Sequence, residues 1–159
     1  SLTIYSLLRV QSVLVRNFRQ QLSSILEANT GGSIHLKYVD FENIQCNVTS
    51  SSKMYGVVAM PSCIEASKGT ICRFVYEGGS VKYLNNGYVP NTNAIYLGFL
   101  YVYRSLVFIK DVKFSYNYLS TSPREKFEMK SLLYTYSPVV RYEGLEFSHN
   151  YCLSASLIY

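Results

Sequence analysis

The sequence contains no tryptophan, only two aspartates (Asp40 and Asp111) and only two histidines (His35 and His149) among 159 residues. Metal sites and acid–base pairs draw heavily on aspartate and histidine, so their scarcity leaves few candidates for either kind of site. Neither histidine has a partner at metal-ligand spacing, and neither a C-x-x-C nor a G-x-S-x-G motif occurs. We therefore expect no catalytic residue, no metal site and no cofactor.

Long apolar stretches are also missing. The longest one spans residues 94–103 and is ended by Arg104, well short of the roughly 20 residues that a membrane-spanning helix needs. We therefore expect no insertion into a membrane. The hydrophobic content of 48 % is enough for a buried core, so a single domain over residues 1–159 is predicted.

The chain is basic, with a net charge of +5 and a pI of about 9.0. Its Lys and Arg residues are spread along the sequence, and the nearest thing to a cluster is Arg124, Lys126 and Lys130. No basic run is interleaved with aromatics, so we expect no nucleic-acid binding. The charge indicates either a solvated basic surface or attraction to polyanions such as acidic glycans.

Four cysteines and one glycosylation sequon favour an extracellular or cell-surface location. The sequon is Asn47-Val48-Thr49, which makes Asn47 the expected glycosylation site. Cys63 and Cys72 lie nine residues apart, so we expect a local disulfide between them. The other two disulfide candidates are Cys46 and Cys152.

A short pattern recurs along the chain: an aliphatic residue, a polar residue, an aromatic residue, two variable residues and Asn. Its alternation is typical of strands with one buried face, and Asn suits the corner where a strand ends. Stacked Asn side chains can also bond to one another as a ladder. The predicted core aromatics are Phe41, Tyr83, Phe114 and Phe147, and the predicted corner residues are Asn86, Asn117 and Asn150.

The aromatic positions recur at intervals of 42, 31 and 33 residues, and Phe18 is a further candidate 23 residues before Phe41. Intervals of this size are typical of one turn of a parallel β-solenoid, and the longest indicates an inserted loop around residues 49–73. Residues 1–27 allow two interpretations. We favour strands at 2–5 and 12–16, and the alternative is a helix that caps the solenoid and ends at Thr30-Gly31-Gly32.

Two kinds of short motif give the sequence a family resemblance. Gly31-Gly32-Ser33-Ile34 and Gly78-Gly79-Ser80-Val81 are similar to a G-G-A-I motif, and Phe114-Ser115-Tyr116-Asn117 and Phe147-Ser148-His149-Asn150 match F-x-x-N. The chain thereby resembles the pectin-lyase-like surface proteins with polymorphic outer-membrane-type repeats, including large surface proteins of protists. The resemblance implies an all-β fold, a right-handed parallel β-helix, and a structural or adhesive role without catalysis.

Cys46 and Cys152 each lie five residues after a repeat aromatic, so they occupy one repeat position near opposite ends of the expected stack. They are too far apart to pair within one solenoid, whose strands are about 4.8 Å apart. Across a head-to-tail junction they approach disulfide distance. The alternative is that both are free thiols.

Three functions follow, in order of preference. The first is an extracellular structural glycoprotein that self-assembles head to tail into a filament or coat, because an open solenoid leaves two strand edges to pair. The apolar tail at 153–159 is then expected to add a strand to a neighbour. Alternatively, the edges are covered by other parts of a longer surface protein. The second function is an adhesin-like module that binds glycans or proteins, and the third is a polysaccharide lyase or hydrolase.

Overall fold

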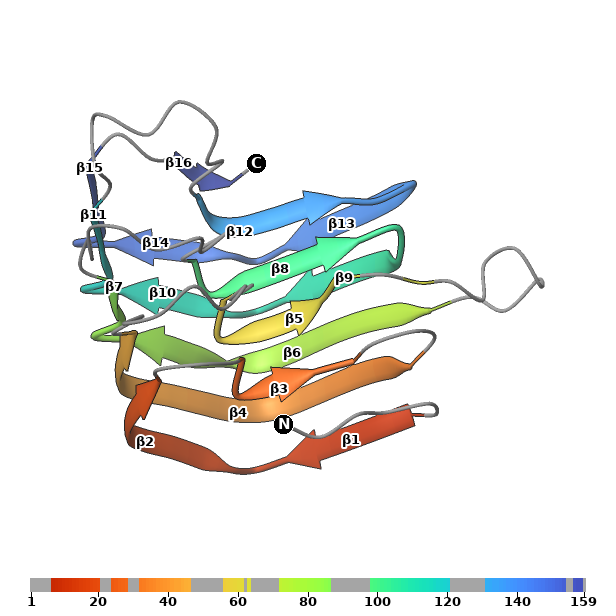
Figure 1. Ribbon diagram of the computed structural model, residues 1–159, viewed down its shortest axis with the longest axis horizontal. Coiled ribbons are helices and arrows are strands. Elements are labelled where there is room, and N and C mark those ends of the chain that lie inside the picture. Colours follow the sequence, from red (N-terminus) through yellow and green to blue (C-terminus); the bar gives the residue numbers. More distant parts are fainter. Residues whose placement is uncertain are drawn as a thin grey trace.

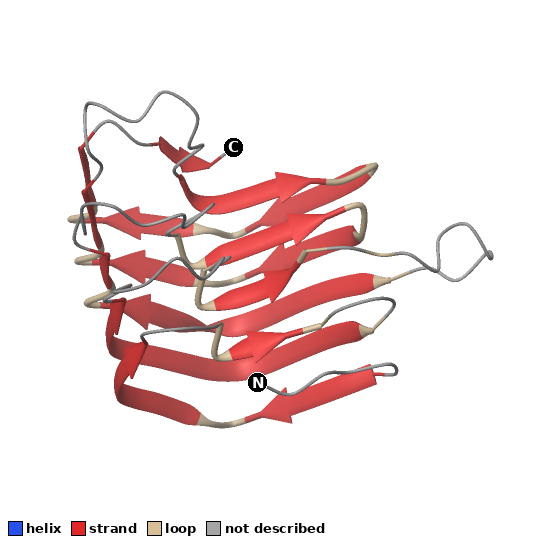
Figure 2. Ribbon diagram, viewed as in Figure 1, coloured by secondary structure: helices blue, strands red, loops and turns tan. Residues whose placement is uncertain are grey.

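The computed structural model of the chain describes residues 7–20, 24–28, 32–46, 56–61, 63, 72–86, 98–120, 131–153 and 156–158. Within these ranges the chain forms sixteen strands and no helix (Figure 2). Every strand pair is parallel. The prediction of an all-β protein is therefore confirmed.

The strands belong to two sheets. The smaller sheet has the order β16-β12-β8-β5-β3 and contains β3 (Leu26–Glu27), β5 (Val58–Met60), β8 (Leu100–Tyr103), β12 (Ser131–Tyr136) and β16 (Ser156–Ile158). The larger sheet contains β1 (Leu7–Gln11), β2 (Leu14–Gln20), β4 (Ser33–Cys46), β6 (Arg73–Lys82), β7 (Asn85–Asn86), β9 (Leu106–Lys110), β10 (Lys113–Ser115), β11 (Tyr118–Ser120), β13 (Val139–Glu143), β14 (Glu146–Ser148) and β15 (Tyr151–Leu153).

The strands are stacked in five levels, which Figure 1 shows from red at the N-terminal end to blue at the C-terminal end. In each level the chain runs along the larger sheet, crosses to the smaller sheet and returns one strand spacing further on. The levels consist of β1–β3, β4–β5, β6–β8, β9–β12 and β13–β16. Ser33 pairs with Leu7, and Leu106 pairs with both Arg73 and Val139. Equivalent residues of successive levels therefore form columns along the stack.

The core lies between the two sheets and is centred on aromatic rings. The ring of Phe99 lies 5.0 Å from that of Phe41 and 6.1 Å from that of Phe114, both in edge-on contacts that aromatic pairs favour. Tyr76 is fully buried beside them, and its hydroxyl donates a 2.6 Å hydrogen bond to the carbonyl oxygen of Val39. Burial, together with the nearby Asp40 carboxylate, raises the pKa of Tyr76 well above its usual value.

Both chain ends and the expected insertion differ in part from the sequence predictions. Residues 7–11 and 14–20 are strands, so the capping-helix alternative is wrong there, while the strand predicted at 2–5 lies outside the described residues. The insertion at 49–73 is not all loop, because it contains β5, which pairs with β3 and β8. The C-terminal tail contains β16, which pairs with β12 of the same chain through one edge, so the expected addition of a strand to a neighbour concerns its other edge and stays a prediction.

Candidate functional site

One interior column carries the repeat aromatics. Its members follow from the strand register, and they are Val15, Phe41, Val81, Phe114 and Phe147. The rings of Phe114 and Phe147 are stacked with centroids 5.1 Å apart. The prediction is wrong for Tyr83, which is 50 % exposed and lies two residues beyond Val81. Phe18 is also outside this column, because it pairs with Ile44.

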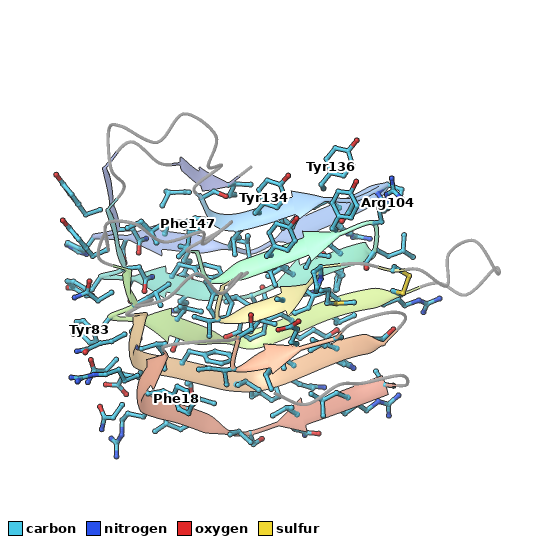
Figure 3. The ribbon with its side chains drawn as sticks, viewed as in Figure 1. Phe18, Tyr83, Arg104, Tyr134, Tyr136 and Phe147 are labelled. Carbon is cyan, nitrogen blue, oxygen red and sulfur yellow. A yellow bond between two sulfur atoms is a disulfide. The ribbon has the colours of Figure 1, made fainter. Side chains whose placement is uncertain are left out.

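Tyr83 instead belongs to an exposed column at the corner that follows the interior aromatics (Figure 3). All of its residues have left-handed backbone conformations, with φ between 52° and 58°: Asn17, Asn43, Tyr83, Tyr116 and His149. Asn43 donates a 2.8 Å hydrogen bond to Asn17 Oδ1. The ring of Tyr116 lies 5.4 Å from that of Tyr83 and 4.7 Å from that of His149. Identical or similar side chains therefore stack at the corner and compensate for a backbone conformation that non-glycine residues rarely adopt.

The predicted Asn ladder exists between Asn117 and Asn150. The side-chain amide of Asn117 donates to Asn150 Oδ1 at 2.9 Å and to the Val81 carbonyl oxygen at 3.0 Å. Its Oδ1 accepts from the backbone N–H of Leu84, and Asn150 Oδ1 accepts from the backbone N–H of Asn117. The left-handed residue is the one before each Asn, so the Asn residues serve hydrogen bonding and not the corner conformation.

The third predicted corner residue, Asn86, is not equivalent to the other two. It pairs with Leu119, which lies two residues beyond Asn117. The repeat pattern places Tyr83 in the aromatic position, whereas the interior position of this level is held by Val81. The two Gly-Gly-Ser motifs are not equivalent either. Ile34 pairs with Phe74, whereas Val81 pairs with Phe41. Gly79 has a φ of +98°, and an added Cβ would clash with the carbonyl oxygen of Val39 on the paired strand, so this position requires glycine.

The cysteines divide into one bonded pair and two separated residues. Cys63 and Cys72 are joined by a disulfide with their Cα atoms 6.0 Å apart, which confirms that prediction. Cys46 lies opposite Asn86, and the column continues through Leu119 to Cys152. Three strand spacings, roughly 14 Å, therefore separate the backbones of Cys46 and Cys152, too far for a bond within the chain. The predicted glycosylation site Asn47 lies outside the described residues.

Both ends of the stack leave interior columns uncovered. At the N-terminal end Phe18 is 44 % exposed, whereas Ile44 beside it in the next level is 1 % exposed. At the C-terminal end Val140 is 37 % exposed, whereas Val107 beneath it is 2 % exposed. Phe18 and Val140 are therefore core-type side chains that lack a covering level within the described chain.

The outer face of the smaller sheet carries two ladders of tyrosines (Figure 3). Tyr101 of β8 stacks on Tyr134 of β12 with centroids 4.9 Å apart and ring planes 4° apart. Tyr103 stacks on Tyr136 at 5.1 Å, and the guanidinium of Arg104 lies 5.0 Å from the Tyr103 ring. The stacked rings combine apolar surface with polar hydroxyl tips on the outer face of the sheet, and such side chains suit contact with another molecule.

The acidic side chains at the C-terminal end of the larger sheet are engaged in ion pairs. Lys110 Nζ lies 2.8 Å from Glu143 Oε1, and Lys113 Nζ lies 3.2 Å from Glu146 Oε2. Hydrogen bonding and charge attraction between Lys110 and Glu143 raise the pKa of the lysine and lower the pKa of the glutamate. Among the residues described by the structure, no group of three or more Cys, His, Asp or Glu is arranged to hold a metal ion.

The described part of the chain contains no helix long and apolar enough to cross a membrane. Comparison with protein-family models, curated proteins and solved structures found no match to this chain. The structure itself establishes the fold class, which is all-β with parallel sheets.

Proposed function

We propose that the chain is a right-handed parallel β-helix that acts as an extracellular structural glycoprotein and assembles head to tail through its two open ends. The stacked levels support the β-helix, and the strong preference of parallel crossover connections for the right hand supports its handedness. The Cys63–Cys72 disulfide supports an oxidising, extracellular setting. The role is structural and requires no catalytic centre.

The exposed interior columns carry this proposal. Phe18 and Val140 occupy positions that are almost fully buried one level further in. The end strands also have one unpaired edge among the described residues, and such edges favour pairing with another strand. A second copy satisfies both needs at once. Because the two ends are different surfaces, this contact is heterologous and repeats into a filament.

The register of the five levels predicts the register of the junction. If the C-terminal level of one copy continues the columns into the N-terminal level of the next, Val140 meets Leu8 and Phe147 meets Val15. In this register Cys152 lies opposite Gln20 of the next copy, and Cys46 lies one level beyond it. The separation of Cys152 from that Cys46 is about 10 Å, which exceeds disulfide reach, so the register-matched stack does not form the Cys46–Cys152 bond predicted from the sequence.

Blocking one end at a time tests head-to-tail assembly. Wild-type protein is expected to form filaments in negative-stain micrographs and a concentration-dependent series of species in sedimentation velocity. Phe18→Lys and Val140→Lys each place a charge on one end and are each expected to remain monomeric, because burying an unpaired charge is costly. An equimolar mixture is expected to stop at dimers, since each variant retains one intact end.

The matched control is Tyr38→Lys, which introduces the same charge at a 56 % exposed tyrosine in the second level. It should assemble like the wild type. Monodisperse wild-type monomers at high concentration, or equal loss of assembly in the control, would refute the proposal.

A binding module is the second candidate, and the tyrosine ladders on β8 and β12 favour it. Tyr134 and Tyr136 present stacked rings that suit glycan or protein recognition. A glycan array probed with wild type and with Tyr134→Ala/Tyr136→Ala tests this candidate, and unchanged binding by the variant would count against it. Polysaccharide cleavage is least favoured, and release of products from acidic polysaccharides is its direct test.

A further inference from the structure

A basic groove crosses the outer face of the larger sheet, away from the tyrosine ladders of the smaller sheet. It has a volume of about 830 Å³, within the size range of ligand sites. Side chains from β1, β4, β6, β9 and β13 line it, so it crosses all five levels. This length is roughly 20 Å at the usual strand spacing.

Three arginines lie along the groove at alternate levels. Arg9 is in the first level, Arg73 in the third and Arg141 in the fifth, and all three are exposed. Successive arginines are therefore two strand spacings apart along the stack, about 10 Å. The register places Arg9 and Arg141 in one column and Arg73 two residues to the side. The spacing suits a linear ligand that carries a negative group at regular intervals.

Apolar side chains separate the arginines. Leu7, Val75, Leu106 and Val139 line the same groove. A sugar chain has apolar C–H faces as well as polar edges, so this alternation suits it. Two phenylalanines line the groove, of which Phe74 is fully buried, and the guanidinium of Arg141 lies 5.6 Å from the ring centroid of Phe108. Phe108 is also only partly exposed, which disfavours the open base stacking that single-stranded nucleic acids use.

His35 and Glu77 lie near the middle of the groove. Their side chains approach to 3.8 Å, longer than a hydrogen bond. His35 Nε2 is buried and has no hydrogen-bond partner among the described residues. Glu77 contributes the one negative charge among the residues that line the groove.

We propose that this groove binds a linear acidic polysaccharide, with Arg9, Arg73 and Arg141 holding successive carboxylate or sulfate groups. The arginine fork suits both oxyanions because it donates two parallel hydrogen bonds. The polymer lies along the stacking direction, and its apolar faces pack on the aliphatic side chains between the arginines. The groove reaches the end-to-end contact, because Arg9 lies in the first level and Arg141 in the fifth, but polysaccharide binding does not require assembly.

Heparin and polygalacturonate are the probes, with calorimetric titration of both at 0.15 M salt. Arg9→Gln/Arg73→Gln is expected to weaken binding at least tenfold, because each arginine contributes charge-assisted hydrogen bonds. Arg141→Gln tests the far end of the groove independently and should weaken binding severalfold. Glu77→Gln should strengthen binding, since it removes a like charge from the site.

The matched control is Arg16→Gln/Arg19→Gln, which removes the same two charges from exposed positions on β2 outside the groove. It should change affinity less than twofold. Equal weakening by both double variants would show attraction to net charge alone and would overturn the site. Binding of neutral dextran, or of duplex DNA with the same dependence on the variants, would overturn the ligand class. Thermal unfolding of each variant verifies that it is folded.

Discussion

Single residues fix this fold through side chains that repeat from level to level. Asn117 is 1 % exposed and bonds to both neighbouring levels, to Leu84 and Val81 in the third and to Asn150 in the fifth. A buried amide whose donors and acceptors are satisfied links the backbone of one level to that of the next. The F-x-x-N pattern predicted this ladder correctly, because Asn recurs in register with the preceding Phe in the last two levels.

Replacing Asn117 with Ala is expected to cost about 3 kcal/mol of unfolding free energy, because the Leu84 N–H and the Val81 carbonyl lose a buried partner. Asn85→Ala, at an exposed position on β7, should cost about 0.5 kcal/mol or less. Urea denaturation followed by circular dichroism measures both. Similar losses for the two variants would argue against the ladder as a source of stability.

The sequence misled at Tyr83 for a physical reason. In a continuous strand Tyr83 would point to the same side as Val81, because the two residues are two positions apart. The sequence pattern therefore predicts an interior side chain at Tyr83 as well. The distinguishing feature is the left-handed backbone at Tyr83, which turns the chain before the alternation continues. Backbone conformation at a non-glycine residue is not readable from residue type. The aligned column Asn17, Asn43, Tyr83, Tyr116 and His149 became visible only through the strand register.

Among the elements, the positions of several strands could be predicted from the sequence, but the strands with which they pair could not. The alternation in the repeat pattern identified strands, because residues 112–114 and 145–147 coincide with β10 and β14 to within one residue. The short strand β5 was missed, since its three residues are all buried and show no alternation. The basic groove was missed for another reason. Its arginines come from positions 9, 73 and 141, which only the stacking of levels brings to one face.

The disulfide ties the end of β5 to the start of β6 across nine residues of sequence. Removing it with Cys63→Ser/Cys72→Ser is expected to cost about 2 to 3 kcal/mol, because the unfolded chain regains the freedom of that closed loop. Thermal unfolding with and without reductant measures the effect.

The matched control for the disulfide is Cys46→Ser/Cys152→Ser, whose residues lie three levels apart. This variant should keep the reductant-sensitive unfolding of the wild type, whereas the first variant should lose it. A wild-type midpoint that does not move with reductant would contradict the stabilising role of the Cys63–Cys72 bond.

For the whole molecule, charges on the outer faces reinforce one register. Lys37, Glu77, Lys110 and Glu143 form a column in which the sign alternates at every level. If one level slipped by one residue along its neighbour, the opposite charges would no longer face each other, and the interior side chains would turn outward. Matching of the columns across the proposed junction also fixes the register between two copies. This register places Arg141 beside Arg9 of the next copy, so two positive charges meet there. Assembly should therefore increase with ionic strength, which screens this repulsion.

A designed cross-link tests the junction register directly. In a Cys46→Ser background, Gln20→Cys is expected to oxidise into a ladder of covalent oligomers on non-reducing gels, because the proposed register pairs position 20 with Cys152 of the preceding copy, one strand spacing away. Adding Cys152→Ser should abolish the ladder. Oligomers that persist without Cys152, or monomers in both variants, would contradict the register.

Each level touches only the level before it and the level after it through its strand pairs. Amide hydrogens of the middle level are therefore enclosed by two neighbours, and those of the outer levels by one. Exchange with deuterated solvent should be slowest in β6 and become faster toward β1 and β13, as separation of one level at a time costs less than global unfolding. In an assembled filament this gradient in exchange rate should flatten, because the outer levels of each internal copy are covered by neighbouring copies.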